Sequence, residues 1–529
     1  MECCACNMKK LSEFSFEECP PVLTTDAMRA LDAAAKKTMQ AESEIDAGYE
    51  LMKEAGAALF ARVQKLLLEH QTASKTVAVL VGGGNNGGDG LVLAKLLLAV
   101  DVQCIVFSLA KGEKFKNEAG LALNDFLNAG GVLNYIENPE SSFAHFGKNP
   151  PFALVVDAML GNGASGELRP AFAAMARLVN DWNVAVLAAD APTGYDSSEH
   201  VRRADCVVAS ETMLFGYPRL DAYVQEGGCV FGKANVARLR YDEALAAQFA
   251  DGVFLATENM IDALMPVRNE WGDKRAQGSA MIVAGSANMP GAAALCTGAA
   301  LRSGAGLVTL ATPKPVFPIV ATKLSEPVFL PLAGDCICPA DVPQILHGLR
   351  HAQSLAIGPG LSTAKETGEA VLALLSQVQV PMVIDADALN ILAASKETLK
   401  NISAPAIFTP HVREFARLFG ELPAKAVEIP AMLRGVAKTI GKVIVLKGAP
   451  TFVALPNGCV YVVPVANSGM AKGGSGDVLT GILASLLSLG MDVCEAAVLG
   501  VLLHQRAGRI ARTKKGAFAM LPSDVIDSL

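Results

Sequence analysis

The 529-residue chain is poor in aromatic and charged side chains, which make up 6% and 18% of its residues. It has no window of 18 or more uninterrupted apolar residues, so we expect no transmembrane helix. The net charge of −7 lacks the basic excess that nucleic acids attract, which argues against DNA or RNA as the main partner. With 51% hydrophobic residues the chain is instead expected to be well buried and globular, and its length predicts two domains.

The 12 cysteines do not form a recognisable metal-binding pattern. Cys3, Cys4 and Cys6, followed by Cys19, have no second pair of cysteine or histidine residues nearby, which argues against a zinc site. Most other cysteines lie in apolar runs, as expected for reduced thiols in a cytoplasmic enzyme. We therefore predict a cytoplasmic protein in which residues 1–21 form a loosely structured tail.

The most informative stretch runs from Asn467 to Gly490. It opens as a glycine-rich turn over 469–476 and continues as an apolar segment of helical length. Converging backbone N–H groups and the positive end of a helix form an anion site suited to phosphate. Asp477 stands at this point and would repel phosphate, unless it deprotonates a hydroxyl beside a transferring phosphoryl group. The alternative is a buried helix with an ordinary N-terminal turn.

A strand, a glycine-rich turn and a helix also follow one another in the first half of the chain. After two helices predicted within 26–69, a β-branched strand over 76–81 runs into the turn 82–90, and a helix is expected over 91–100. The glycines of this turn match the G-x-G-x-x-G fingerprint of dinucleotide phosphate binding.

Two features distinguish this unit from that of a dehydrogenase. The next predicted strand, 103–108, ends without the acid that would hold a ribose. The turn also carries more polar side chains than a pyrophosphate needs: Asn85, Asn86 and Asp89.

Two later predicted strands, 152–157 and 183–189, are followed by acids at or beside their carboxyl ends, Asp157 and Asp190. Ligands bind at this edge of an open α/β sheet, although each acid taken singly could be a helix cap or a turn former. Neutral asparagine and threonine oxygens beside a carboxylate could hold a monovalent cation.

The segments 84–90, 155–163 and 190–194 together resemble the NAD(P)H-hydrate epimerase family. This resemblance implies a Rossmann-like three-layer domain that binds hydrated NADH or NADPH and a potassium ion. It implies potassium ligation by Asn86, Asp157 and Thr193. The residues it implies for the substrate are Asn85, Asn86, Gly87, Gly88, Asp89, Gly161, Asn162, Gly163, Ala164, Ser165, Gly166, Glu167 and Asp190.

Two positions depart from the family's pattern. Thr193 replaces a serine, and Arg219 replaces a lysine in the motif Phe-Gly-x-Pro-Lys. These departures keep open a non-catalytic, nucleotide-binding role for the N-terminal half.

The second half again alternates strands and helices, which predicts a mostly parallel sheet with helices on both faces. Its motifs, in order over about 279–490, resemble the ADP-dependent NAD(P)H-hydrate dehydratase family of ribokinase-like fold. The resemblance implies substrate contacts from Ala292, Gly360, His411 and Asp477. It implies adenine-nucleotide contacts from Lys447, Gly448, Ala449, Pro450, Thr451 and Gly476.

The combined prediction is a bifunctional repair enzyme, with an epimerase domain over 22–245 and a dehydratase domain over 246–529. ADP would phosphorylate the hydroxyl of the hydrate with Mg²⁺ present, Asp477 would take the proton, and AMP and phosphate would be released. In the epimerase, Asp157 or Asp190 would assist the proton movements. We also expect a homo-oligomer. The alternative is a small-metabolite kinase of the ribokinase superfamily joined to a non-catalytic nucleotide-binding domain.

Overall fold

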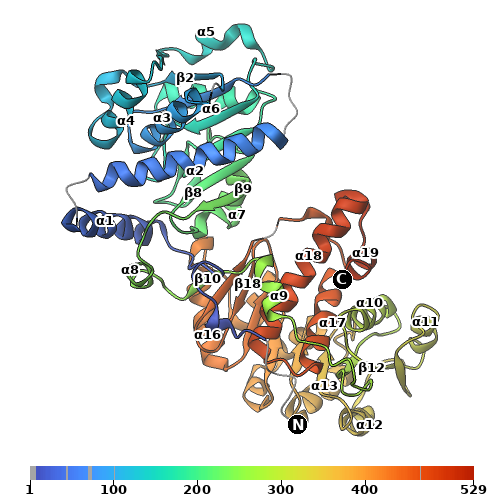
Figure 1. The fold of residues 1–529 in the computed structure, drawn as a ribbon. Helices are drawn as coiled ribbons and strands as arrows, with labels where there is room; N and C mark the ends of the chain where they lie inside the picture. The colour runs from blue at the N-terminus through green and yellow to red at the C-terminus, as the bar shows by residue number, and fades with distance from the viewer. Residues whose placement is uncertain (1–7, 43–45, 70–73, 101, 465) are drawn as a thin grey trace. The chain divides into compact units, whose positions relative to one another are not determined.

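The computed structural model describes residues 8–42, 46–69, 74–100, 102–464 and 466–529 (Figure 1). The chain divides into two compact units, Pro21–Asp251 and Gly252–Leu529, the second of which also includes the start of the chain up to Pro20. The predicted boundary at 245/246 therefore falls six residues early. The helix α8 (Glu243–Ala247), with its fully buried Ala246, belongs to the N-terminal unit.

Residues 8–20 are not the loose tail that the sequence predicted. Leu11 and Cys19 are buried in a hydrophobic cluster of the C-terminal unit. The Lys9 amide donates a hydrogen bond of 2.9 Å to the Ala263 carbonyl, and the Leu255 amide donates one of 2.9 Å to Pro20. A few apolar side chains and backbone bonds thus fix a mostly polar segment. Residues 1–7, with their three cysteines, lie outside the described residues.

The N-terminal unit is built on a seven-stranded sheet of order β3-β2-β1-β4-β5-β8-β9, in which all neighbouring strands are parallel. Its strands are β1 (Val77–Val81), β2 (Cys104–Ser108), β3 (Leu133–Tyr135), β4 (Leu154–Ala158), β5 (Val186–Ala189), β8 (Glu211–Phe215) and β9 (Lys233–Ala237). A separate two-stranded ribbon consists of β6 (Tyr195–Asp196) and β7 (Val201–Arg202). The main helices are α1 (Thr25–Glu42), α2 (Ala47–Glu69), α3 (Asn85–Leu98), α4 (Asn117–Asn128), α5 (Pro139–Phe143), α6 (Pro170–Asp181) and α7 (Gln225–Phe231).

Side chains on the two faces of this sheet enter two separate cores. In β1, alternate residues point to opposite faces, so Val79 joins the cluster formed with α2, α3 and α4, whereas Leu80 joins the one formed with α6. Both faces are covered, which explains why β1 reads as a continuous apolar run. Figure 1 shows the long α2 beside this sheet. The predicted three-layer α/β class is confirmed.

The glycine-rich turn differs from its prediction, because α3 begins at Asn85 and not at residue 91. Gly84 is the extended N-cap, and the polar residues that follow form the first two turns of the helix. Their glycines allow close packing: a side chain at Gly87 would collide with the Gly82 carbonyl, and one at Gly90 would meet Ala158.

Gly87→Ala is therefore expected to destabilise the N-terminal unit by about 1–3 kcal/mol, as overpacking usually does. Trp182 is buried in this unit and Trp271 in the other unit is 96% exposed, so tryptophan fluorescence during urea unfolding should report mainly the N-terminal unit. Gly84→Ala is the matched control, because nothing lies within 4 Å of its added Cβ and its φ is −99°. Equal midpoints for the two variants would contradict the packing argument.

The C-terminal unit contains a ten-stranded sheet of order β10-β19-β18-β17-β16-β15-β14-β11-β12-β13. Only β18 runs antiparallel to its neighbours among the described strands of this sheet. The strands are β10 (Val253–Leu255), β11 (Ser279–Val283), β12 (Leu307–Pro313), β13 (Val328–Leu332), β14 (Ser354–Ile357), β15 (Met382–Ile384), β16 (Ala406–Phe408), β17 (Val443–Leu446), β18 (Thr451–Ala454) and β19 (Val460–Val463).

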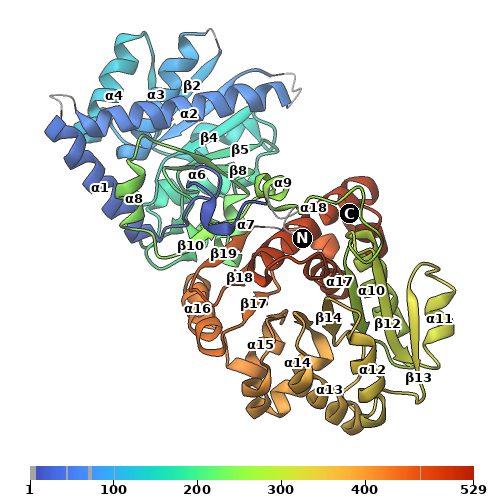
Figure 2. The same ribbon diagram turned by 60° about the horizontal axis from the view of Figure 1, so that its bottom comes forward.

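Helices cover both faces of this sheet, as the alternating sequence pattern predicted. Figure 2 shows α10 and α17 on one side and α13 and α14 on the other, in agreement with the two hydrophobic clusters. The helices are α9 (Ile261–Leu264), α10 (Pro290–Arg302), α11 (Phe317–Ala321), α12 (Val342–Leu349), α13 (Lys365–Gln377), α14 (Ala386–Ala394), α15 (Val412–Phe419), α16 (Ile429–Ile440), α17 (Ser475–Ser488), α18 (Val493–Ala519) and α19 (Pro522–Ile526). Within the described part of the chain, none of the helices has the length and apolar character needed to cross a bilayer.

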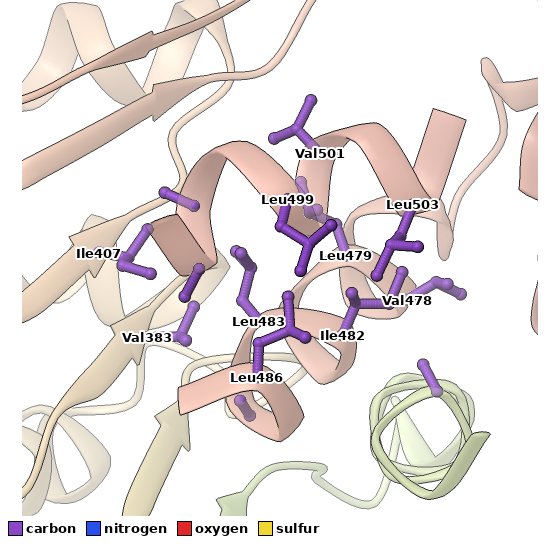
Figure 3. Packing of buried hydrophobic residues seen from close by; sticks show 14 of the residues in the cluster. Val383, Ile407, Val478, Leu479, Ile482, Leu483, Leu486, Leu499, Val501 and Leu503 are labelled. Atoms are coloured by element: carbon purple, nitrogen blue, oxygen red, sulfur yellow. The ribbon is translucent and has the colours of Figure 1, made fainter. Parts of the chain in front are cut away.

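The helix α17 is the centre of the C-terminal core. Every residue from Val478 to Ser488 is buried. Figure 3 shows its side chains between α18 and the sheet, where Val383 and Ile407 point toward them. A helix buried on all sides has little freedom to shift, so its N-terminal turn, with Asp477, is held in a fixed place.

Candidate active sites

A pocket of 540 Å³ lies at the carboxyl ends of β1, β4 and β5 in the N-terminal unit. The segments after these strands bring Asn85, Gly161 and Asp190 to its wall. Helices α1 and α2 and the segments after β8 and β9 complete the lining. Parallel strands that end at one edge of a sheet make such a crevice, and its volume suits a small organic ligand.

The pocket contains most of the epimerase residues that the sequence predicted, but not all of them. Gly87 and Gly88 are packed against the Gly82 carbonyl and Met52 and do not line it. Glu167 is 78% exposed and lies 3.7 Å from Arg203. Ser165 and Gly166 are likewise outside the lining. The predicted residues that do line the pocket are Asn85, Asn86, Asp89, Gly161, Asn162, Gly163, Ala164 and Asp190.

Asp190 is held rigidly at the pocket wall. Nη1 of the fully buried Arg219 donates to Oδ1 of Asp190 at 2.6 Å, and Nη2 donates to its backbone carbonyl at 2.5 Å. The Asn162 amide donates to Oδ2 at 3.2 Å. Arg219 also lies 3.7 Å from the buried Asp221. The arginine that stands in place of the usual lysine of the epimerase motif therefore holds Asp190 in position.

Asp89 also lines the pocket, and its carboxyl group is more deeply buried than that of Asp190. Burial first, and then the negative charge of Asp190, raise the pKa of Asp89 well above its usual range. These effects favour the neutral form of its carboxyl group over the charged one. Two carboxyl groups whose environments differ in this way can act as a proton donor and a proton acceptor.

Asp157 is fully buried and does not line the pocket. Its Oδ1 accepts a hydrogen bond of 2.7 Å from Thr193 Oγ1, and its Oδ2 accepts one of 2.8 Å from the Thr193 amide. Burial raises the pKa of Asp157 to about 6, against the effect of these bonds. The carboxylate is thus held by its neighbours and does not border the pocket.

Asn86 has a buried side chain whose Oδ1 and Nδ2 have no hydrogen-bond partner among the described residues. The Asn86 side chain lies against Gly161. The preceding residue, Leu160, donates a hydrogen bond of 3.0 Å from its amide to Thr193 Oγ1. Such an orphaned amide oxygen is free to bind a hard monovalent cation.

Sequence reasoning missed the contribution of α1. Arg29, Asp32 and Lys36 line the pocket, and Arg29 donates to the Asn162 carbonyl. Asp32 pairs with Lys36 at 2.8 Å and accepts a bond of 3.0 Å from the Tyr241 hydroxyl. Their four-residue spacing indicated only a helix with an ordinary surface ion pair, so nothing in the sequence linked them to the site.

A second site lies at the carboxyl ends of the neighbouring strands β14, β15, β16 and β17. These strand ends are followed by Gly358, Asp385, His411 and Lys447. An isolated parallel bridge joins His411 to Lys447. A Cβ at Gly360 would lie 2.9 Å from the Ala292 Cβ, so these two predicted residues are also neighbours.

His411 has a structural task in addition to its predicted one, because it caps α15. Its Nδ1 accepts hydrogen bonds from the Arg413 and Glu414 amides at 3.1 and 3.2 Å. In return, Glu414 Oε2 accepts from the His411 amide at 2.8 Å. The imidazole remains 48% exposed, and its Nε2 lies 3.5 Å from Glu414 Oε1.

Lys447 lies beside Gly476, as the phosphate-site prediction required, since a Cβ at Gly476 would be 3.4 Å from Nζ. Its charge is nevertheless matched by carboxylates that the prediction did not include. Nζ donates to Asp385 Oδ1 at 2.6 Å and lies 3.8 Å from Glu414 Oε2. The turn after Lys447 has exposed Gly448 and Ala449 and buried Pro450, and the Thr451 hydroxyl donates to the Gly448 carbonyl at 3.0 Å.

Asp477 lies in the first turn of α17. Burial first, and then the charge of Asp385, raise the pKa of Asp477 to about 7, while Lys447 opposes this rise. A carboxylate with a pKa near the working pH is suited to general base catalysis.

Two family models match one unit of the chain each. A family model described as NAD(P)H-hydrate dehydratase matches residues 280–529, and one described as YjeF-related protein N-terminus matches residues 48–220. The structure of an ADP/ATP-dependent NAD(P)H-hydrate dehydratase from Bacillus subtilis, co-crystallised with ATP/Mg²⁺, is 29% identical. It covers 51% of this chain and 94% of that protein, with a TM-score of 0.43.

Longer relatives match both units at once. The bifunctional NAD(P)H-hydrate repair enzyme Nnr of Moorella thermoacetica is 36% identical over 493 residues, which cover 90% of this chain and 91% of the relative. The protein of the same name from Escherichia coli is 31% identical over 487 residues, which cover 91% and 88%. The two resemblances drawn from the sequence motifs are confirmed, and the chain belongs to the bifunctional NAD(P)H-hydrate repair enzyme family.

Proposed function

We propose that this chain repairs hydrated NADH and NADPH. The N-terminal unit interconverts the R and S hydrates, and the C-terminal unit dehydrates the S hydrate with ADP and releases AMP and phosphate. The observation that carries this proposal is a carboxyl group with a pKa near 7, Asp477, in the first turn of a buried helix and beside Lys447 and Gly476. A general base at a phosphate-binding helix terminus is the combination that phosphorylation of a hydroxyl requires.

In the dehydratase reaction, Asp477 takes the proton of the hydrate's hydroxyl as its oxygen attacks the terminal phosphorus of ADP, and AMP leaves. Amides of the first turn of α17 and the Lys447 ammonium stabilise the transferring phosphoryl group. The lone pair of the ring nitrogen then expels phosphate from the carbon, and loss of a proton from the adjacent carbon restores the ring double bond. Magnesium, when bound through the nucleotide's phosphate oxygens, neutralises part of their charge.

For the epimerase, we assign the proton movements to Asp190 and Asp89, and not to Asp157. Asp190 and Asp89 line the pocket, and burial raises the pKa of Asp89, whereas Asp157 does not line the pocket and is hydrogen-bonded to Thr193. Asp190 would accept the hydroxyl proton of the hydrate as the carbon–nitrogen bond opens, and Asp89 would protonate the ring nitrogen. Closure on the other face of the carbonyl returns both protons and gives the second epimer.

Potassium would be held by Asn86, Asp157 and Thr193, and its positive charge would offset the buried Asp157 carboxylate. The orphaned Asn86 oxygen supports this assignment. A cytoplasmic location and a homo-oligomeric state stay predictions.

The function is tested by incubating the purified chain with each separate epimer of NADPH hydrate, ADP and Mg²⁺, and by following the absorbance of the reduced ring. We expect recovery of NADPH from both epimers. Recovery from neither would refute the proposal, and recovery from the S hydrate alone would leave the N-terminal unit without catalysis. A stable phosphorylated product would favour the small-metabolite kinase.

The rate of dehydration is expected to depend on pH through Asp477. The base works only when ionised and its pKa is about 7, so kcat should rise with pH through about 7 and fall roughly tenfold per unit well below it. Single-turnover rates on the S hydrate at saturating ADP measure this. A rate that stays constant from pH 5.5 to 8 would exclude Asp477 as the titrating base.

A further inference from the structure

Asp385 is the most firmly held carboxylate of the dehydratase site. It is 1% exposed and follows β15. Its Oδ1 accepts a bond of 2.6 Å from Lys447 Nζ, and its Oδ2 accepts one of 2.7 Å from Thr480 Oγ1 on α17. The tight turn at Gly358 leaves no room for a side chain against the Asp385 carbonyl, so the backbone is fixed as well.

This carboxylate is close to the proposed base. A Cβ at Gly476, the residue before Asp477, would lie 3.9 Å from Asp385 Oδ2. The Asp385 charge is the second largest cause of the raised pKa of Asp477, after burial. Lys447 lowers that pKa and Asp387 raises it further.

The negative charge that Asp385 places near Asp477 is not supplied by three other titratable neighbours. Glu414 lies 3.8 Å from Lys447 and shares its charge. Burial lowers the pKa of His504 on α18 to about 4, so this imidazole is uncharged at neutral pH. Burial also keeps the Cys296 thiol on α10 protonated, because it raises its pKa well above the usual value.

We propose, on the basis of the dehydration reaction above, that Asp385 is a positioning residue. It anchors Lys447 at the N-terminal turn of α17, and its negative charge partly cancels the effect of the Lys447 charge on Asp477. Lys447 alone would stabilise the Asp477 carboxylate and weaken it as a base. With one donor of its ammonium group on Asp385 and another toward Glu414, Lys447 still has a third for a phosphate oxygen. Asp385 thereby allows one site to contain a cation for phosphate and a base for the hydroxyl.

Asp385→Asn tests this proposal with little change of shape. The asparagine oxygen can still accept from Lys447, and its NH2 group can donate to the Thr480 hydroxyl, which donates in the wild type. Removal of a nearby negative charge should move the acidic limb of the dehydration pH–rate profile down by about one unit or more. Above pH 8, where Asp477 is ionised in both proteins, the variant should be slower than the wild type, because its Asp477 is a weaker base. Thr480→Val is the matched control: it removes a bond to Asp385 but keeps the charge, so its limb should stay at the wild-type pH.

A direct titration keeps the test independent of activity. In ¹³C-aspartate-labelled full-length chain, the carboxyl signal missing from Asp477→Asn identifies Asp477. Its midpoint in Asp385→Asn should lie about one unit below that of the wild type. An unchanged midpoint and limb in a folded Asp385→Asn chain would overturn the proposal while wild-type dehydration stands. Failure of the wild type to recover NADPH from the S hydrate would instead overturn the proposed function.

Discussion

Asp477→Asn is expected to lower kcat of dehydration by about 10²–10⁴-fold, the usual contribution of a general base. The amide has nearly the same shape but cannot take the hydroxyl proton. Because Lys447 is held by Asp385 at 2.6 Å and not by Asp477, the nucleotide site should remain formed. Stopped-flow recovery of NADPH absorbance from the S hydrate measures the loss, and calorimetric titration with ADP should give a Kd within a few-fold of the wild type.

Asp387→Asn is a suitable control for this prediction. Its carboxylate lies two residues after Asp385, but Oδ2 accepts from the Ser362 amide at 2.8 Å, and no hydrogen bond or ion pair to Lys447 is present among the described residues. It should retain most of the activity, because its charge is the smallest of the causes given for the raised pKa of Asp477. A near wild-type kcat in Asp477→Asn would refute the assignment of the base.

Asp190→Asn is expected to reduce epimerisation by about 10²–10⁴-fold and to leave dehydration of the S hydrate intact. The carboxylate that would accept the hydroxyl proton is then absent from the pocket, while the dehydratase site belongs to the other unit of the chain. The measurement is the recovery of NADPH from the R hydrate alone, corrected for spontaneous epimerisation.

The loss of one partner of the buried Arg219 could destabilise the unit, so folding must be checked in the same variant. Trp182 fluorescence provides this check. Glu167→Gln changes a predicted site residue whose side chain is 78% exposed, and it should epimerise at the wild-type rate. If Asp157→Asn alone abolished epimerisation in a folded chain and Asp190→Asn did not, our choice between the two acids would be wrong.

Local sequence patterns were sufficient for the elements and for the edge of the sheet where function lies. Buried parallel strands read as continuous apolar runs, and the acids that follow them mark the carboxyl end of each sheet. The positions of Asp190, His411 and Lys447 were predictable for this reason. The segment 467–490 likewise contained both a glycine turn and a helix in its own composition.

Predictions failed where close packing, and not local preference, set the conformation. The glycine-rich composition of Asn85–Gly90 predicts a turn, yet the segment is helical, since Gly87 and Gly90 are needed for contact with Gly82 and Ala158. Residues 8–20 look like a polar tail, but their few apolar side chains fit a core more than 200 residues away in the chain.

The sequence by itself determined the two α/β units, their family and the acids that could carry the chemistry, because these depend on short motifs and on hydrophobic periodicity. Only the tertiary structure decided where these acids lie and what surrounds them. It placed Asp190 and Asp89 in the pocket and tied Asp157 to Thr193. It also set Asp385 between Lys447 and the first turn of α17. Burial and the charges of residues distant in sequence fix protonation, and neither is encoded in the residues next to an acid.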